Sequence, residues 1–378
     1  MNHKIAVVNR TNLKNYGSVL QVYALCEAIR KLGHDSEVVW QKGNMSKNFD
    51  LRPNKAAKTI IKLLCHPSLL YSTFKTIREV NKIVIDEKKI ELFDSFVAAN
   101  FRQTLYGPGE IESVAASDKY DKFVCGSDQI WVTTTLYPDP MMYLRFAPKH
   151  KRIAYAPSLG RNYIPNYNKR ILKKYISDVS CLSVREDEGY RLIKELIGRE
   201  AAVVADPTLL LRSEEWDRLK KDIDTPEKYV LCYFLDEPSN EVKEAICKYA
   251  DSSNSEIVVL GKLVNLDFPQ EKIHRPVAGP AEFLSLIDKS DIVITDSYHG
   301  MLFAINYRKR FWSVERAYSQ YDQSSRQLTV LSRLGMEDRY LKNNYEITDS
   351  PIDYEKVLPK LEEFVSFSMK YLENAINS

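Results

Sequence analysis

Short apolar runs alternate with amphipathic stretches along most of the 378-residue chain. Residues 4–9 form the first apolar run, and in residues 18–32 apolar side chains recur every three or four positions, as on one face of a helix. Gly33 then stands where a helix commonly ends. The alternation of strand and helix patterns continues and favours a largely parallel sheet. The other expected strands are 37–40, 122–125, 153–156, 181–184, 202–205, 229–235, 256–260, 292–295 and 311–314, and the other expected helices are 186–197, 240–250, 281–288, 301–307 and 354–375.

The pattern falls into two series, separated by a polar stretch at residues 161–168 that carries Pro165. Polar stretches with proline are typical of domain boundaries, and the chain is long enough for two α/β domains. We therefore expect an α/β protein with two facing, doubly wound, Rossmann-like domains, residues 1–165 and 166–345. Residues 346–378 are expected to form a C-terminal helix that packs back on the first domain. Ligands of such folds bind beyond the carboxyl ends of the strands, so the loops there should hold the site.

Composition excludes membrane-spanning and disulfide-rich classes. Hydrophobic residues make up 44% of the chain and charged residues 28%, which is ordinary for a globular protein. No apolar run approaches the roughly 20 residues of a membrane-spanning helix. The first residues lack the apolar segment of a secretory signal, so a cytoplasmic protein is expected. The cysteines and histidines show no CxxC, HxxxH or HExxH spacing, and we therefore expect no metal site.

The net charge of +3 indicates no particular partner, but its distribution is uneven. Residues 52–89 contain nine Lys or Arg against three acidic residues, with apolar residues interleaved. One interpretation is a basic helical insertion, near residues 52–92, with a solvated face. The other is a surface that rests on anionic lipid or holds a lipid-linked phosphate, with the protein peripheral at the inner membrane face. The sequence leaves both interpretations open.

The strongest candidate loop is residues 297–300, Ser-Tyr-His-Gly, which follows a buried strand and precedes an expected helix. Ser297 and Gly300 lie where free backbone N–H groups and the positive end of the helix dipole suit a phosphate or carboxylate. His299 can donate to an anion there or move a proton near neutral pH. The alternative is a capping loop in which the histidine has a structural hydrogen bond.

Two more loops carry groups suited to a ligand. Residues 126–129 combine a glycine, which permits close backbone approach, with the carboxylate of Asp128 and the amide of Gln129; the alternative is an ordinary turn. Residues 15–18 form a glycine-containing turn between a strand and a helix, but lack a full phosphate-binding motif. In that turn, Asn15 or Ser18 acting as a helix N-cap is the alternative.

Arg185 lies directly after the expected strand 181–184 and directly before the expected helix 186–197. A guanidinium in that position can clamp a carboxylate or a phosphate with two parallel hydrogen bonds. Alternatively, it can pair with the neighbouring acids Glu186 or Asp187. Residues 205–208, which include Asp206, are expected to form a structural turn because the proline suits a rigid bend.

Taken in order, these loops resemble those of the polysaccharide pyruvyl transferase family. The resemblance spans roughly residues 4–340 and departs at the basic insertion. The motifs that carry it are residues 15–18 with Gln21, 24–25, 126–131, 183–186, 206–210 and 295–300, and Ser325 and Arg326 ahead of a helix ending at Leu334 and Gly335.

The resemblance implies pyruvyl transfer from phosphoenolpyruvate to a sugar of a bacterial-type surface polysaccharide or its lipid-linked precursor, usually as a cyclic ketal. It also implies a fold similar to glycosyltransferase-B enzymes, with phosphoenolpyruvate as co-substrate and no cofactor, metal or nucleic-acid partner. His299 is then the expected acid or phosphate-activating group, and Asp128 the expected base or acceptor-orienting carboxylate. The expected substrate-binding residues are Arg185, Ser297, Gly300, Asn15, Gly17, Ser18, Gln129 and Arg326.

Two other function classes stay open. A nucleotide-sugar-dependent glycosyltransferase would use the same two-domain architecture, but the sequence offers no identifiable nucleotide-recognition loop. A sugar-binding or scaffolding protein would have lost catalysis, which the presence of Arg185, Asp128 and His299 argues against.

Overall fold

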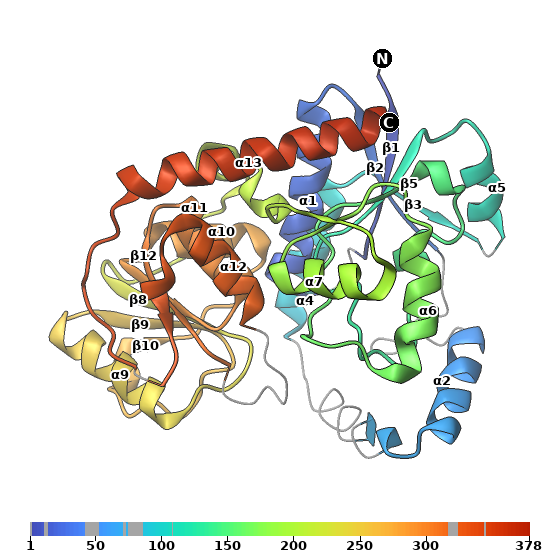
Figure 1. The fold of residues 1–378 in the computed structure, drawn as a ribbon. Helices are drawn as coiled ribbons and strands as arrows, with labels where there is room; N and C mark the ends of the chain where they lie inside the picture. Colours follow the sequence, from blue (N-terminus) through green and yellow to red (C-terminus); the bar gives the residue numbers. More distant parts are fainter. Residues whose placement is uncertain are drawn as a thin grey trace.

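Two parallel sheets with helices packed around them make up the fold (Figure 1). The computed structural model describes residues 2–10, 14–41, 53–70, 73–74, 86–107, 109–316, 324–343 and 345–378. The strands are β1 (Lys4–Val8), β2 (Asp35–Gln41), β3 (Gln103–Tyr106), β4 (Lys122–Cys125), β5 (Arg152–Ala154), β6 (Ser183–Val184), β7 (Ala202–Val203), β8 (Tyr229–Phe234), β9 (Glu256–Gly261), β10 (Ile273–His274), β11 (Ile292–Thr295), β12 (Arg310–Val314) and β13 (Tyr340–Leu341). The helices are α1 (Tyr16–Lys31), α2 (Pro53–Cys65), α4 (Glu87–Asn100), α5 (Glu110–Ala116), α6 (Asn166–Ser177), α7 (Asp187–Ile197), α8 (Ser213–Trp216), α9 (Asn240–Ser252), α10 (Pro280–Lys289), α11 (Tyr298–Asn306), α12 (Ser325–Leu334) and α13 (Tyr354–Asn377).

Both sheets have the strand order of a Rossmann fold. The first runs β3-β2-β1-β4-β5 and the second β10-β9-β8-β11-β12-β13, with every pair parallel. Their central strands are apolar and buried on both faces, as in all six residues of β8, because helices cover both sides. The strand order reverses between β1 and β4 and between β8 and β11, where ligands of doubly wound sheets bind. The two-domain α/β fold class is therefore confirmed.

β6 and β7 form a short parallel pair beside the first sheet. Cys181, just before β6, makes an isolated parallel bridge to Ile153 of β5. This stretch is therefore hydrogen bonded to the edge of the first sheet. The predicted domain limits at residues 165 and 345 stay predictions.

Helices between the sheets join the two halves through one apolar core. Tyr16 of α1 stacks on Phe283 of α10 with ring centroids 4.5 Å apart, and its hydroxyl donates to the carbonyl of Ala278 at 3.0 Å. The long α13 starts beside the second sheet and reaches the first, where Tyr371 donates to the carbonyl of Ala154 at 3.1 Å (Figure 1). These contacts fix the position of the loops of one sheet relative to the loops of the other.

The predicted strands and helices are present, with bounds that differ by a few residues. The largest change is at α11, which begins at Tyr298 rather than at residue 301, because Ser297 caps it and accepts from the N–H of Gly300. The pattern analysis missed β3, α5 and α6, and also the short elements β10, β13 and α8. In the predicted basic insertion, α2 and α4 are helical, whereas residues 71–72 and 75–85 lie outside the described residues.

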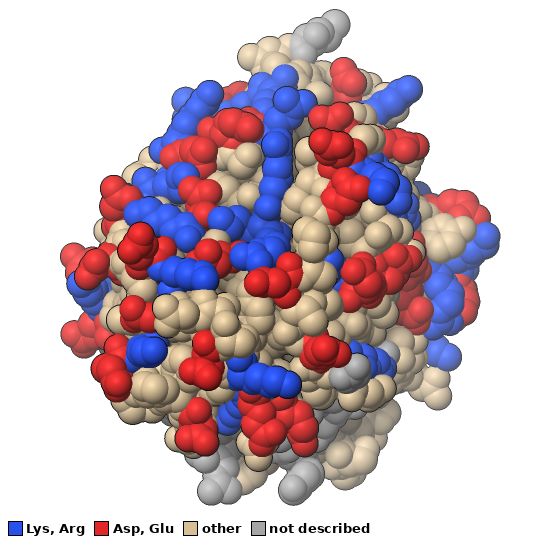
Figure 2. Space-filling view, turned by 90° about the vertical axis from the view of Figure 1, so that its left-hand side faces the viewer, with Lys and Arg blue, Asp and Glu red and all other residues tan. Residues whose placement is uncertain are grey.

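Charge is mixed over the face of the second half that carries α9. Figure 2 shows Lys and Arg side chains interspersed with Asp and Glu on that face. Within the part of the chain that the structure describes, no helix has the length and hydropathy needed to cross a membrane.

Candidate functional site

A completely buried guanidinium, that of Arg185, lies where the loops of the two sheets meet. Its Nη1 donates to Asp206 Oδ2 at 2.9 Å, and its Nη2 lies 3.3 Å from Asp128 Oδ1. Its Nε is 3.8 Å from Glu186 Oε2, beyond hydrogen-bond distance. Burial alone would lower the pKa of Arg185, but Asp128 and Asp206 raise it above its usual value. The side chain therefore stays charged although no water reaches it.

Asp206 holds several parts of the site together. One carboxylate oxygen accepts from the backbone and hydroxyl of Thr208, at 3.0 and 2.9 Å, and the other accepts from Ser127 at 3.0 Å. Burial raises the pKa of Asp206, but His299 and Arg185 outweigh burial and hold it well below its usual value. The predicted turn is present, with Asp206 as the N-cap of the short helix Pro207–Leu209, and its carboxylate also binds the buried arginine.

Asp128 faces the same centre from the loop after β4. Its Oδ2 accepts from the hydroxyl of Ser18 at 2.5 Å, while Oδ1 faces Arg185. Burial raises the pKa of Asp128, but Arg185 and His299 lower it below its usual value. Its side chain is 23% exposed, so this ionised carboxylate is the one that a ligand can reach.

His299 lies in the first turn of α11 and is 7% exposed. Its Nε2 is 3.5 Å from Asp206 Oδ2. The other side of the ring packs against the backbone of Gly17, where a Cβ would come within 2.0 Å of Nδ1. The glycine is therefore required for this close approach, and the structure brings together two of the predicted site residues, one from each half.

Tyr298 lies between two arginines. Its ring centroid is 4.5 Å from the guanidinium carbon of Arg185 and 5.9 Å from that of Arg326. Burial raises the pKa of Tyr298, so its hydroxyl stays neutral. That hydroxyl has no hydrogen-bond partner among the described residues, although the side chain is 3% exposed.

Arg326 places a second buried guanidinium beside the first. With its amide oxygen turned toward the guanidinium, Gln129 accepts from Arg326 Nη2 at 3.0 Å. Burial and the nearby charges of Arg185 and Arg316 lower the pKa of Arg326. Glu186 and Asp128 act in the opposite direction, and an anion bound beside Arg326 would add to their effect.

Buried polar atoms without partners are concentrated in this region. Within the described residues, these atoms include Arg185 Nε, Glu186 Oε2, Tyr298 Oη and His299 Nε2. Burial also raises the pKa of Glu186. Unsatisfied buried groups are costly, so their clustering favours a polar ligand. An adjoining pocket of about 320 Å³ is lined by Gly160, Arg161, Asn162, Glu186, Glu188, Arg191, Ser325 and Arg326.

Three predicted binding residues form local caps. Asn15 is the N-cap of α1 and accepts from the N–H of Ser18 at 3.1 Å. In the first turn of α11, the N–H of Gly300 donates to the hydroxyl oxygen of Ser297 at 3.3 Å. These contacts agree with the capping alternatives, and a role of the three residues in substrate binding stays a prediction.

Arg185 and the side chains grouped around it form the cluster around Arg185: Asp128, Glu186, Asp206, Tyr298, His299 and Arg326. Sequence reasoning missed three of its members, namely Asp206, Glu186 as a buried group, and Tyr298. A strand-end position was the available signal for Asp206, since Arg185 and Asp206 follow the paired strands β6 and β7. Tyr298 gave no such signal, because an aromatic residue at the start of an apolar helix is typical of a core position.

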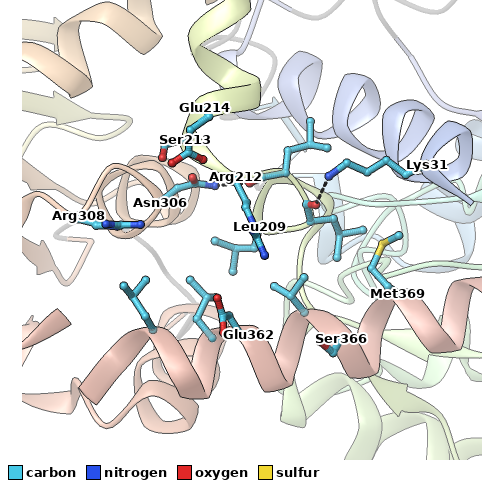
Figure 3. A pocket seen from close by; sticks show the side chains of 15 residues that line it. Lys31, Leu209, Arg212, Ser213, Glu214, Asn306, Arg308, Glu362, Ser366 and Met369 are labelled. Atoms are coloured by element: carbon cyan, nitrogen blue, oxygen red, sulfur yellow. Dashed lines mark hydrogen bonds between the residues drawn. The ribbon is translucent and has the colours of Figure 1, made fainter. Parts of the chain in front are cut away.

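A second cavity, of about 390 Å³, lies apart from this cluster (Figure 3). It opens between α13 and residues 209–214, with Lys31 and Arg308 at its sides. None of the residues around Arg185 lines it. Across the described residues, no group of three or more His, Cys, Asp and Glu side chains is placed to share a metal ion.

Comparisons with known proteins identify a family and a fold. The family model described as polysaccharide pyruvyl transferase matches residues 15–318. No curated protein sequence matches the chain. The UDP-bound MnaA structure from S. aureus is 11% identical and has a TM-score of 0.50, covering 100% of this chain and 98% of that one.

Two further solved structures are similar at lower scores. The UDP-GlcNAc 2-epimerase from Neisseria meningitidis is 11% identical, with a TM-score of 0.45 and coverage of 99% of this chain and 94% of that one. The glycosyltransferase SnogD from Streptomyces nogalater is 13% identical, with a TM-score of 0.46 and coverage of 99% and 98%. At such identities the likeness concerns the fold alone.

Replacing Gly17 by alanine should force the imidazole of His299 out of place. Overpacking of this kind costs about 1–3 kcal/mol of unfolding free energy. In a His299→Gly background neither the ring nor the Cβ of residue 299 is present, so Gly17→Ala should cost much less there. Urea unfolding of the two single variants and the double variant measures this coupling. An equal cost in both backgrounds would show that the two residues do not touch.

Asp206→Asn should cost about 3 kcal/mol of unfolding free energy at pH 7, because it leaves Arg185 with one carboxylate fewer. The depressed pKa of Asp206 gives stability that is fully present above the unfolded value of about 3.9. That stability is lost as the pH falls from there toward the lower folded pKa. The difference in unfolding free energy between wild type and Asp206→Asn should therefore be the same at pH 7 and pH 5, and smaller below pH 4.

Urea unfolding at each pH measures this difference, with Asp251→Asn on the exposed side of α9 as the control. A difference that grows on acidification, or a control that behaves like Asp206→Asn, contradicts the assignment.

Proposed function

Since the family match covers residues 15–318, the chain belongs to the polysaccharide pyruvyl transferase family and is a transferase, and we propose that phosphoenolpyruvate is its donor. The product is proposed to be a pyruvate ketal on a sugar of a surface polysaccharide or its lipid-linked precursor. The observation that carries this proposal is the group of buried guanidiniums of Arg185 and Arg326 around the ring of Tyr298.

This arrangement suits a small ligand with two anionic groups. Phosphoenolpyruvate carries a phosphate and a carboxylate on the same carbon, C2, and guanidiniums bind both groups with paired hydrogen bonds. Burial and neighbouring guanidiniums lower the pKa of Arg326, and an anionic donor bound beside it would favour its charged form. The unpartnered hydroxyl of Tyr298 and Nε2 of His299 give donors on the same side.

The proposed reaction needs two proton movements. C3 of phosphoenolpyruvate gains a proton, and a sugar hydroxyl oxygen attacks the resulting electron-poor C2. A second hydroxyl oxygen then bonds to C2 as the C2–O bond to phosphate breaks. Of the two hydroxyl protons, one balances the proton taken up at C3 and the other leaves with phosphate. No oxidant or reductant is consumed.

His299 is the residue proposed to move these protons or to activate the departing phosphate. It lies in the helix-start position that favours an anion, next to Asp206. Asp128 is better suited to orient the acceptor than to remove a proton, because its pKa is lowered and both its oxygens are engaged. Its ionised carboxylate also offsets positive charge that develops at C2.

The proposed setting is the cytoplasmic side of a membrane, with peripheral contact through the basic insertion. The alternative, a nucleotide-sugar-dependent glycosyltransferase, is compatible with the same fold. No described feature favours it.

His299→Ala should lower phosphate release from phosphoenolpyruvate plus acceptor by about 10²–10⁴-fold, the usual range for removing an acid–base group. Phosphate release measured with a mixture of lipid-linked sugars tests this, and urea unfolding confirms that the variant folds. His274→Ala on β10 is the matched control and should retain activity. Turnover near that of wild type in His299→Ala would refute the role of this histidine.

A further inference from the structure

An apolar pocket edged by positive charge lies between α2 and α6, outside the cluster around Arg185. Its volume is about 520 Å³. Four of its lining side chains are Lys or Arg, and none is acidic. The lining includes Lys58, Ile61 and Lys62 of α2 and Arg170, Ile171 and Lys174 of α6.

α2 is fixed to α6 at this pocket by polar contacts. Lys62 donates to Asn168 Oδ1 at 2.6 Å, and its ammonium lies 5.3 Å from the ring of Tyr167. Burial lowers the pKa of Lys62 to about 8. An anion beside it would favour the charged form, so the pocket is better matched to a negatively charged ligand than to a neutral one.

The outer side of the same segment is apolar and exposed. Ile60 is 57% exposed, Ile61 59% and Leu64 75%, and Leu70 and Phe74 are exposed farther along. Half of the large apolar side chains that are exposed in the described residues lie within residues 60–74. Residues 53–70 contain three lysines and no acidic residue. Apolar side chains next to lysines, without acids, are typical of surfaces that enter an anionic bilayer.

Neighbouring cavities share lining residues in a series from this pocket to the one that includes Arg326. Arg170 lines both the α2 pocket and a neighbouring cavity of about 620 Å³ along α6. Arg191 lines that cavity and the pocket that includes Arg326. α6 adds Lys169 and Lys173 and has no acidic residue. We call this row of cavities the track along α6; its lining carries the Lys and Arg side chains of α6 on one side and the acidic Glu188 and Glu195 of α7 on the other.

We propose that the exposed side of α2 docks on an anionic phospholipid bilayer, with one lipid phosphate bound in the pocket at Lys58 and Lys174. The lipid chain then lies against Ile61 and Ile171. Binding to the bilayer does not itself depend on the proposed function. Only its role does, which is to bring a membrane-held acceptor to the track along α6. In Figure 1 α2 lies at the lower end of α6, away from the second sheet.

Sedimentation of the full chain with vesicles tests the proposal without donor or acceptor. The chain should sediment with vesicles of phosphatidylglycerol and phosphatidylcholine but not with phosphatidylcholine alone, and about 1 M salt should weaken binding. Leu64→Asp, and Lys58→Glu with Lys174→Glu, should each reduce partition by about tenfold or more. Matched controls are Phe367→Asp on the exposed side of α13 and Lys248→Glu on α9, which should bind as wild type does.

Equal sedimentation with both vesicle types, or none with either, overturns the proposal. Binding of the α2 and α6 variants at the wild-type level overturns it as well. Competition by inorganic phosphate alone would identify a soluble phosphate as the occupant and likewise overturn bilayer docking. Because sedimentation measures no turnover, its result tests bilayer docking independently of the proposed pyruvyl transfer.

Discussion

The ion pairs of Arg185 with Asp206 and Asp128 are the constraint on which the site depends. A guanidinium removed from water loses its hydration and must recover that free energy from nearby carboxylates. The carboxylates come from different loops, after β4 and after β7, so the pair fixes the position of one loop against the other. Removing either partner would leave an uncompensated buried charge, and the geometry of these loops is therefore tightly specified.

The same interaction organises the contact between the two halves. Asp206 lies beside His299 of α11, and that imidazole packs on the backbone of Gly17 in α1. Tyr298 places its ring against Arg185 from the second half. The stacked rings of α1 and α10 and the crossing helix α13 hold these elements together. A site assembled from both sheets can thus be rigid before its ligand arrives, which lowers the free-energy cost of binding.

Much of the fold could be predicted from the sequence, because central strands of parallel sheets are continuous apolar runs. β4 and β11 begin and end where the pattern predicts. β3 was missed because its residues are mostly exposed and carry no such run. α6 was missed because its apolar positions are interrupted by four basic residues.

The site was only partly predictable. Arg185, Asp128 and His299 were found because each follows a strand. The partner of Arg185 was expected next to it in sequence, at Glu186 or Asp187, whereas the closest carboxylate belongs to Asp206. Pairing of β6 with β7 brings these residues together, and a single sequence does not reveal which strands are neighbours. Arg326 was expected only through the family resemblance, because its place beside Tyr298 depends on how α12 packs, which is likewise a tertiary property.

Mass spectrometry of the acceptor tests the central claim most directly. The protein is incubated with a panel of lipid-linked sugars and either phosphoenolpyruvate or UDP-sugars. A buried anion site built around Arg185 and Arg326 predicts an acceptor that gains the mass of pyruvate less water, with one phosphate released for each product. A mass gain of one sugar from the UDP-sugar, and none from phosphoenolpyruvate, would contradict it.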